Sequence, residues 1–434
     1  MIKEFLNIFY FFILENMLSF IHKDLRSFVM NIAVAQSGGP TCAINASLLG
    51  VFKGAIRSDK IDIVFGSLNG IEGIINDDLI ILNDYIKTYL DFEKLRQTPS
   101  TVLNSCRYKL PEYTEDASVY EKIVNNLKAH GIGAFFYIGG NDSMDTVNKL
   151  SKYLEKIECD IKVIGIPKTI DNDLMITDHT PGFGSAAKYV ATTVQEIVRD
   201  CSVYSINSIT IIEIMGRDTG WLTAASAVLR ANGEIAPHLI YLPEAHFSVQ
   251  SFIKDLKRVQ QSRRAVVVAV SEGVTLSEED INSEFYNETS DEFGHRYLSG
   301  VGKTLENIVR KEIGCKVRSI ELNVMQRCSS HLSSKTDIEE AEQIGVVAVE
   351  RALKGESGKV MYFKRVSNSP YTLVIDSVDA NEIANKVKYF PLGWINASGN
   401  NVTDEAVDYI MPLIQGEQDI HYMNGVPIHF KLGN

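Results

Sequence analysis

The sequence has little that would suit a disulfide scaffold, a zinc ribbon or a redox dithiol. Its six cysteines are scattered along 434 residues, and no two of them have Cys-x-x-Cys spacing. They are Cys42, Cys106, Cys159, Cys201, Cys315 and Cys328. We therefore expect free thiols, as in a cytoplasmic protein kept in a reducing compartment.

An excess of positive charge is also absent. Lys and Arg number 43 against 55 Asp and Glu, which gives a net charge of -12. A chain this acidic is poorly suited to wrapping nucleic acid or lying on an anionic membrane, so we expect neither partner. An anionic substrate would need a local cluster of Lys and Arg.

No run of apolar residues is long enough to cross a membrane. The longest candidate, residues 5–14, is too short, and no small-residue cleavage site follows it. Two interpretations of residues 1–29 stay open: an upstream extension with the true start at Met30, or a weakly membrane-associating segment. We favour the extension, because the strand and helix pattern that begins at Met30 is complete without the residues before it.

From Met30 onward, apolar β-branched runs alternate with helical patterns, which predicts α/β structure with parallel sheets covered by helices. The expected strands are 32–35, 61–65, 134–138, 162–166, 209–214, 239–242 and 265–270. The expected helices include 43–56, 143–156, 185–200 and 252–260. The length suggests two or three domains, and the polar stretch 276–296 is typical of a surface excursion.

Polar and glycine-rich motifs come directly after these strands, where parallel sheets bind ligands. They are QSGGP (36–40), GGNDS (139–143), PKTIDND (167–173), MGR (215–217) and PE (243–244). Gly38 and Gly39 would let backbone amides approach an oxyanion, and Gly139 and Gly140 would do the same. Two such loops suggest a polyphosphate site, although a tight strand-to-helix turn explains either one alone.

Charged residues next to these loops suggest phosphoryl transfer. Asp171 could take the proton of an attacking hydroxyl, and Lys168 could neutralise the transferring group. The alternative is that Asp171 and Asp173 only cap a turn; no ligands at calcium-loop spacing follow them. The guanidinium group of arginine can donate two parallel hydrogen bonds to a phosphate. Three arginines at or just beyond predicted strand ends therefore suggest a sugar-phosphate clamp. They are Arg217, Arg318 and Arg327.

Taken in order, these motifs resemble those of the phosphofructokinase family. The match also includes NSCRY (104–108), SEG (271–273) and QR (326–327), and it runs from about residue 30 to 359. The resemblance implies two Rossmann-like three-layer α/β domains with mostly parallel sheets and an active site in the cleft between them. It implies a donor domain over 30–182 plus about 325–375, a sugar-phosphate domain over about 183–324, and a C-terminal extension over 376–434.

The resemblance also implies a role for each matching residue. Asp171 is the implied general base, with Lys168, Asp142 and Arg217 as further catalytic residues. The implied sugar-phosphate ligands are Thr169, Ile170, Met215, Gly216, Glu244, Arg318 and Arg327. The implied diphosphate ligands are Gly38, Gly39 and Arg107, and the implied Mg²⁺ ligands are Asn141 and Asp173. In the family the Arg318 position reaches in from a neighbouring subunit, which implies a homodimer or homotetramer with shared active sites.

Two positions point to the pyrophosphate-dependent branch of the family. Asp142 stands where ATP-using members have the last glycine of GGDGS, and Lys168 stands where they have the glycine before TIDND. The aspartate would place negative charge where the α-phosphate of ATP would lie, at a cost of several kcal/mol by a rough Coulomb estimate. Pro40 in the GGPT opening fits the same branch.

The sequence departs from the family pattern at three places. Asn141 replaces a metal-associated aspartate, Ser208 replaces a residue that is often basic, and Val324 replaces a His or Tyr that contacts sugar phosphate. These changes leave the identity of the sugar phosphate open.

The resemblance and the residues Asp142 and Lys168 together imply reversible phosphoryl transfer from pyrophosphate to the 1-hydroxyl of fructose 6-phosphate, in glycolysis. The alternatives are an ATP-dependent 6-phosphofructokinase, a pyrophosphate-dependent kinase of another sugar phosphate such as sedoheptulose 7-phosphate, and a non-catalytic regulatory subunit.

Overall fold

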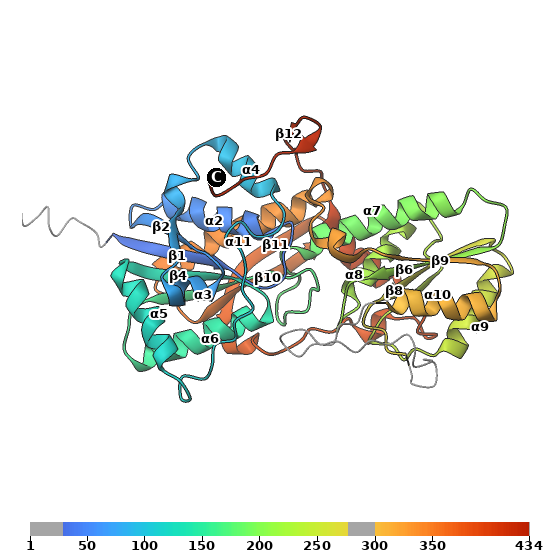
Figure 1. The fold of residues 1–434 in the computed structure, drawn as a ribbon, viewed down its shortest axis with the longest axis horizontal. Helices are drawn as coiled ribbons and strands as arrows, with labels where there is room; N and C mark the ends of the chain where they lie inside the picture. Colours follow the sequence, from blue (N-terminus) through green and yellow to red (C-terminus); the bar gives the residue numbers. More distant parts are fainter. Residues whose placement is uncertain (1–28, 277–299, 434) are drawn as a thin grey trace, which may run out of the picture.

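The computed structural model describes residues 29–276 and 300–433. It places two α/β halves side by side, one around a large sheet and one around a smaller sheet (Figure 1). The expected N-terminal extension and the expected surface excursion lie outside the described residues, apart from Val29 and Leu276.

The larger sheet has seven strands in the order β11-β10-β5-β4-β1-β2-β3. Their bounds are β1 Met30–Gln36, β2 Ile61–Ser67, β3 Leu79–Ile81, β4 Ile132–Gly139, β5 Lys162–Pro167, β10 Lys359–Asn368 and β11 Tyr371–Asp379. All neighbouring strands are parallel except at the two edges, where β3 and β11 run antiparallel to β2 and β10. The carboxyl ends of β1, β4 and β5 therefore meet at one edge.

Helices cover both faces of this sheet because alternate residues of its strands point to opposite sides. On one face Ile32 and Val34 of β1 pack with α2 (Ile44–Ile56) and α11 (Lys335–Leu353). On the other face Ala33 and Ala35 pack with α5 (Ser118–Ala129) and α6 (Asn141–Lys156). α2 and α11 approach closely: a Cβ at Gly50 would lie 2.0 Å from the carbonyl oxygen of Glu342.

The smaller sheet has four parallel strands in the order β7-β8-β6-β9. They are β6 Ser208–Ile214, β7 Leu239–Tyr241, β8 Ala265–Ser271 and β9 Lys316–Glu321. Ile212 faces a core with α7 (Phe183–Cys201) and α8 (Trp221–Ala225). Ile211 faces the opposite core with α9 (Val249–Gln260) and α10 (Val301–Glu312). This half also has three layers, as expected.

The C-terminal residues belong to both halves. Phe390 and the helix α12 (Asp404–Ile410) pack into the core beside α7 and α8. Phe430 then packs into the core of the larger sheet. The predicted domain bounds remain predictions, but the segment over 376–434 contributes side chains to two cores rather than only adding to the surface.

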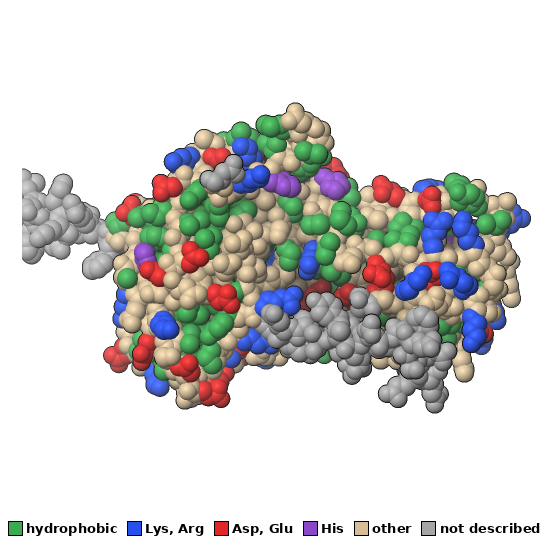
Figure 2. Space-filling view, viewed as in Figure 1, with side chains coloured by type: hydrophobic (Ala, Val, Ile, Leu, Met, Phe, Trp, Pro, Cys, Tyr) green, Lys and Arg blue, Asp and Glu red, His purple; other side chains and the backbone are tan. Residues whose placement is uncertain are grey.

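Charged side chains of both signs are spread over the visible face of the molecule (Figure 2). On the face shown in Figure 2, Lys and Arg side chains are scattered among Asp and Glu over both halves. Within residues 29–276 and 300–433, no helix combines the length and the apolar character that a membrane span requires.

Candidate active site

A cleft of about 500 Å³ lies between the two halves, at the carboxyl ends of β1, β4 and β5 on one side and β6 and β8 on the other. Most of the predicted site residues line it. They are Gly38, Gly39, Arg107, Asn141, Asp142, Lys168, Thr169, Ile170, Asp171, Asp173, Met215, Arg217 and Arg327. Motifs separated by up to about 290 residues of sequence therefore share one cavity, as expected for ligand binding at strand ends.

Lys168 lies in the part of the cleft formed by the larger half, next to the Gly38–Gly39 loop. We call this part the donor side. Its side chain is only 2% exposed, and its Nζ donates a hydrogen bond of 2.6 Å to the carbonyl oxygen of Gly39. Gly38 has a φ of +74°, and a Cβ there would lie 3.2 Å from the same Nζ. Burial lowers the pKa of Lys168 to about 7; the charge of Asp171 opposes this shift and that of Arg327 adds to it. A bound anion would favour the protonated form.

Asp171 lies beside Lys168 in the cleft. Its backbone NH donates to Thr169 Oγ1 at 3.1 Å, and its carbonyl oxygen accepts from Thr219 Oγ1 at 3.0 Å. Burial, followed by the charges of Asp173 and Glu272, raises the pKa of Asp171 to about 7. A carboxylate with a pKa in this range can take up a proton at neutral pH, as a general base must.

The GGNDS loop contributes two neighbours with different surroundings. The Asn141 Oδ1 accepts from the backbone NH of Asn385 at 2.6 Å, and its Nδ2 donates to the Lys386 carbonyl oxygen at 2.7 Å. Both ends of this amide are therefore occupied by the C-terminal segment. Asp142 is about half-exposed at the cleft, and its Oδ1 lies 3.3 Å from Lys109 Nζ.

The opposite wall comes from the smaller sheet. Gly216 has a φ of +142°, and a Cβ there would lie 2.4 Å from the Thr219 carbonyl oxygen, so only glycine fits this turn. The Gly216 NH donates to Glu272 Oε1 at 3.2 Å. Burial raises the pKa of Glu272, and the charges of Arg217 and Arg327 oppose that shift. Two guanidinium groups and a carboxylate thus meet at this wall.

The sequence model of the phosphofructokinase family, described as "Phosphofructokinase", matches residues 31–352. The chain belongs to the phosphofructokinase family. This confirms the predicted family, and the two three-layer halves agree with the predicted α/β fold.

Individual relatives of the chain agree with that assignment. A pyrophosphate–fructose 6-phosphate 1-phosphotransferase from Halomonas elongata is 37% identical over 405 residues, 93% of this chain and 96% of the relative. A sulfofructose kinase from Alkalicoccus urumqiensis is 34% identical over 331 residues, 76% of this chain and 82% of the relative. The crystal structure of a pyrophosphate-dependent phosphofructokinase from Marinobacter aquaeolei matches with a TM-score of 0.82 and 35% identity, covering 94% and 97% of the two chains.

Three predicted ligands, Gly216, Glu244 and Arg318, do not line the cleft. The Glu244 carboxylate accepts from the backbone NH groups of Gly220 at 3.0 Å and Phe390 at 2.9 Å. It thereby ties the C-terminal segment to the smaller half. The predicted role of Glu244 in binding a sugar hydroxyl remains a prediction.

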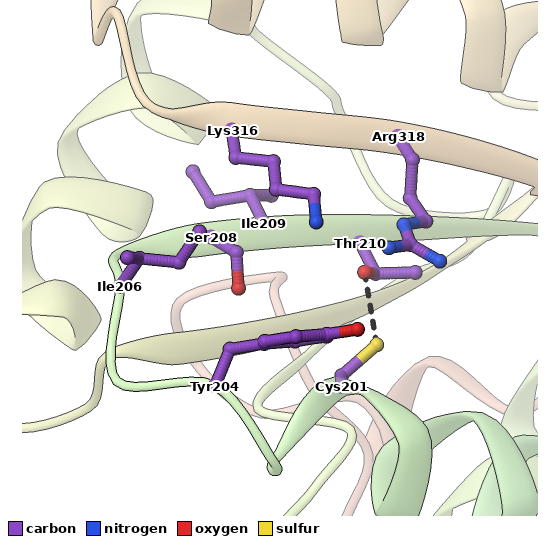
Figure 3. A pocket seen from close by; sticks show the side chains of 8 residues that line it. All are labelled: Cys201, Tyr204, Ile206, Ser208, Ile209, Thr210, Lys316 and Arg318. Atoms are coloured by element: carbon purple, nitrogen blue, oxygen red, sulfur yellow. Dashed lines mark hydrogen bonds between the residues drawn. The ribbon is translucent and has the colours of Figure 1, made fainter.

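Arg318 lies inside β9 rather than at a strand end. It lines a separate hollow with Lys316, Ser208 and Tyr204 (Figure 3), and its Nη1 is 3.6 Å from Asp200. Its side chain is 43% exposed, so it is open to a neighbouring molecule. The predicted reach into a neighbouring subunit remains a prediction.

Sequence reasoning missed several residues that line the cleft. Asp218 and Glu272 follow β6 and β8, and the strand-end signal used for the other motifs could have identified both. Asn385 and Val387 come from an irregular segment more than 200 residues after Asp171 in the sequence. No local pattern marks these two residues as part of the site.

Proposed function

We propose that the chain transfers a phosphoryl group from inorganic pyrophosphate to the 1-hydroxyl of fructose 6-phosphate, reversibly, as a glycolytic enzyme. The products are fructose 1,6-bisphosphate and phosphate. The observation that carries this proposal is that Asp142 and Lys168 line one cavity with the glycine loop at Gly38 and Gly39. The names and near-complete coverage of the Halomonas and Marinobacter relatives support it.

The donor side suits a short, highly charged phosphate ester. The amides of the Gly38–Gly39 loop and the buried Lys168 ammonium can stabilise negative charge on the transferring group, and Arg107 adds a second cation. Asp142 would lie where a longer donor such as ATP continues beyond its second phosphate. Two like charges about 4 Å apart at an effective dielectric constant of about 20 repel by about 4 kcal/mol, which disfavours ATP.

On the acceptor side, Asp171 takes the proton of the sugar hydroxyl while the hydroxyl oxygen attacks the phosphorus of pyrophosphate. The bond to the bridging oxygen of pyrophosphate breaks, and phosphate leaves with that electron pair. Arg217 and Arg327 stabilise the anionic groups of the sugar phosphate and the transferring phosphoryl group from the opposite wall. Thr169, Ile170 and Met215 would hold the sugar itself.

The residues present fit Mg²⁺ if pyrophosphate provides part of its coordination shell. Mg²⁺ commonly binds through one or two carboxylates plus substrate phosphates. Within the described residues no cluster of three or more His, Cys, Asp or Glu could hold a metal alone, but Asp173 and Asp142 line the cleft. Asn141 is a weaker candidate because its amide oxygen accepts from Asn385. The metal would neutralise charge on the phosphates.

A second candidate function changes the acceptor rather than the donor. Among the relatives is a sulfofructose kinase, and Ser208, one of the departures from the family pattern, lines the Arg318 hollow (Figure 3). If that hollow completes a neighbouring subunit's sugar site, as we propose, the loss of a basic residue there would change which anionic group is recognised. We also propose that the enzyme is cytoplasmic and works as a homodimer or homotetramer.

The decisive experiment measures formation of the 1-phosphorylated sugar with Mg²⁺, comparing pyrophosphate with ATP as the donor. Fructose 6-phosphate, sedoheptulose 7-phosphate and sulfofructose serve as acceptors. Turnover of fructose 6-phosphate with pyrophosphate alone is the expected result. Turnover only with ATP would overturn the donor assignment, preference for another acceptor would favour the second candidate, and no turnover in any combination would favour a regulatory subunit.

A further inference from the structure

Residues 385–390, which we name the C-terminal strap, pass beside the cleft and contribute Asn385 and Val387 to its lining. Asn385 Nδ2 donates to Asp145 Oδ1 at 2.9 Å, in addition to the contacts of the strap with Asn141. Val387 forms an isolated antiparallel bridge with Leu174, and Asn385 and Val387 both line the cavity. The strap therefore borders the GGNDS loop (139–143) and the loop that carries Asp171.

Lys388 projects from the strap to the back of the Asp171 loop. Its Nζ donates to Asn172 Oδ1 at 3.0 Å, to the Thr177 carbonyl oxygen at 3.1 Å and to the Asp178 carbonyl oxygen at 2.9 Å. Three acceptors require three N–H donors, so this geometry suits the ammonium form. The same Nζ lies 5.1 Å from the centroid of the Trp221 ring.

Asn172 is held from a second direction as well. Its Nδ2 donates to the Tyr409 hydroxyl at 3.0 Å, and that hydroxyl donates to the Asp178 carbonyl oxygen. Asn172 is fully buried and has a φ of +53°, a left-handed conformation that its surroundings must stabilise. Its neighbours on both sides, Asp171 and Asp173, line the cleft.

We infer that Lys388 and Tyr409 are positioning residues that clamp the side-chain amide of Asn172 and so aim Asp171 and Asp173 into the cleft. Neither residue touches the cavity, and each acts through Asn172. The backbone supports the same arrangement, because the Lys388 NH donates to the Asp173 carbonyl oxygen at 2.7 Å. This inference deepens the proposed function and rests on it for the catalytic readout.

The test uses Lys388→Met, which keeps the length of the side chain but removes its three donors, and Tyr409→Phe, which removes one hydroxyl. Lys386→Met is the matched control: it lies on the same strap, and its exposed side chain pairs with Glu382 Oε2 at 3.2 Å. We expect kcat to fall about 100-fold in Lys388→Met and about tenfold in Tyr409→Phe. The KM values for pyrophosphate and sugar phosphate should stay within threefold of wild type, because the substrate contacts remain.

Hydrogen exchange of the amides in residues 169–178 provides a readout that does not depend on turnover. Exchange should be at least tenfold faster in Lys388→Met than in wild type and in Lys386→Met. Unchanged exchange, unchanged kcat, or a loss confined to KM would overturn the inference. If Lys388→Met does not fold, Tyr409→Phe decides by the same criteria. If wild type shows no turnover with pyrophosphate, the proposed function fails and the exchange comparison alone decides the clamp.

Discussion

Replacing Lys168 with methionine should lower activity while raising stability. A phosphoryl group on the Gly38–Gly39 loop would lie about 4 Å from Nζ, where 332/(εr) with ε of about 20 gives about 4 kcal/mol. Since about 1.4 kcal/mol corresponds to a factor of ten, kcat with pyrophosphate should fall about 1,000-fold. The exposed Lys152 of α6 provides a matched control, and Lys152→Met should leave the rate unchanged.

The stability effect has the opposite sign because burial penalises the ammonium. The fall of the Lys168 pKa from 10.5 to about 7 corresponds to roughly 5 kcal/mol against the protonated form. The lost hydrogen bond to Gly39 offsets about 1–2 kcal/mol of the gain. Lys168→Met should therefore be more stable than wild type by a few kcal/mol.

The pH dependence of that gain follows from linkage. Below pH 7 Lys168 is protonated in both the folded and the unfolded state, so the full penalty on wild type is present. Between about pH 7 and 10.5 the unfolded state alone binds the proton, so wild-type stability rises and the advantage of Lys168→Met shrinks. Urea unfolding at pH 6 and pH 9, together with pyrophosphate kinetics at pH 7, checks both effects. A rate within tenfold of wild type, or a destabilised variant at pH 6, would refute the reasoning.

Three further predictions concern other described residues. Asp171→Asn should lower kcat about 1,000-fold without lowering the melting temperature, and the wild-type rate should fall below pH 7 as Asp171 is protonated. Gly38→Ala should raise the KM for pyrophosphate about tenfold, because alanine tolerates the φ of +74° poorly; an unchanged KM would contradict this. His179→Ala should cost about 3–5 kcal/mol in urea unfolding at pH 6, since it leaves the carboxylates of Asp178 and Glu340 without the imidazole that bonds both at 2.8 Å. These carboxylates raise the pKa of His179 against the effect of burial, so the stability that its protonation adds is complete below pH 6.5 and disappears as pH rises through the folded-state pKa.

The sequence was most informative where strands are buried on both faces. Each of the seven expected strands corresponds to an observed one, because Val- and Ile-rich runs such as 265–270 have few alternatives to a central parallel strand. The hairpin of β10 and β11 was missed. β11 is an edge strand with no fully buried residue, and its burial alternates only over its first four residues, so its sequence pattern is a weak signal.

The candidate site was predictable to the extent that it follows strand ends. The glycine loop, the Asp171 loop and the MGR turn come directly after β1, β5 and β6, so parallel pairing brings them together. The roles of Asn385 and Lys388 could not be predicted, because they depend on where an irregular segment crosses the fold. The burial of Lys168 likewise depends on packing between loops that are far apart in sequence.

The order in which the chain is synthesised has a consequence for this architecture. The core of the larger half lacks α11, β10 and Phe430 until late in translation, and the core of the smaller half lacks Phe390 and Ile410. Neither half can therefore complete its packing before Ile410, for the smaller half, or Phe430, for the larger half, has been synthesised. Apolar surfaces of both halves stay open during elongation, so we expect nascent chains to engage chaperones and prematurely terminated chains to aggregate.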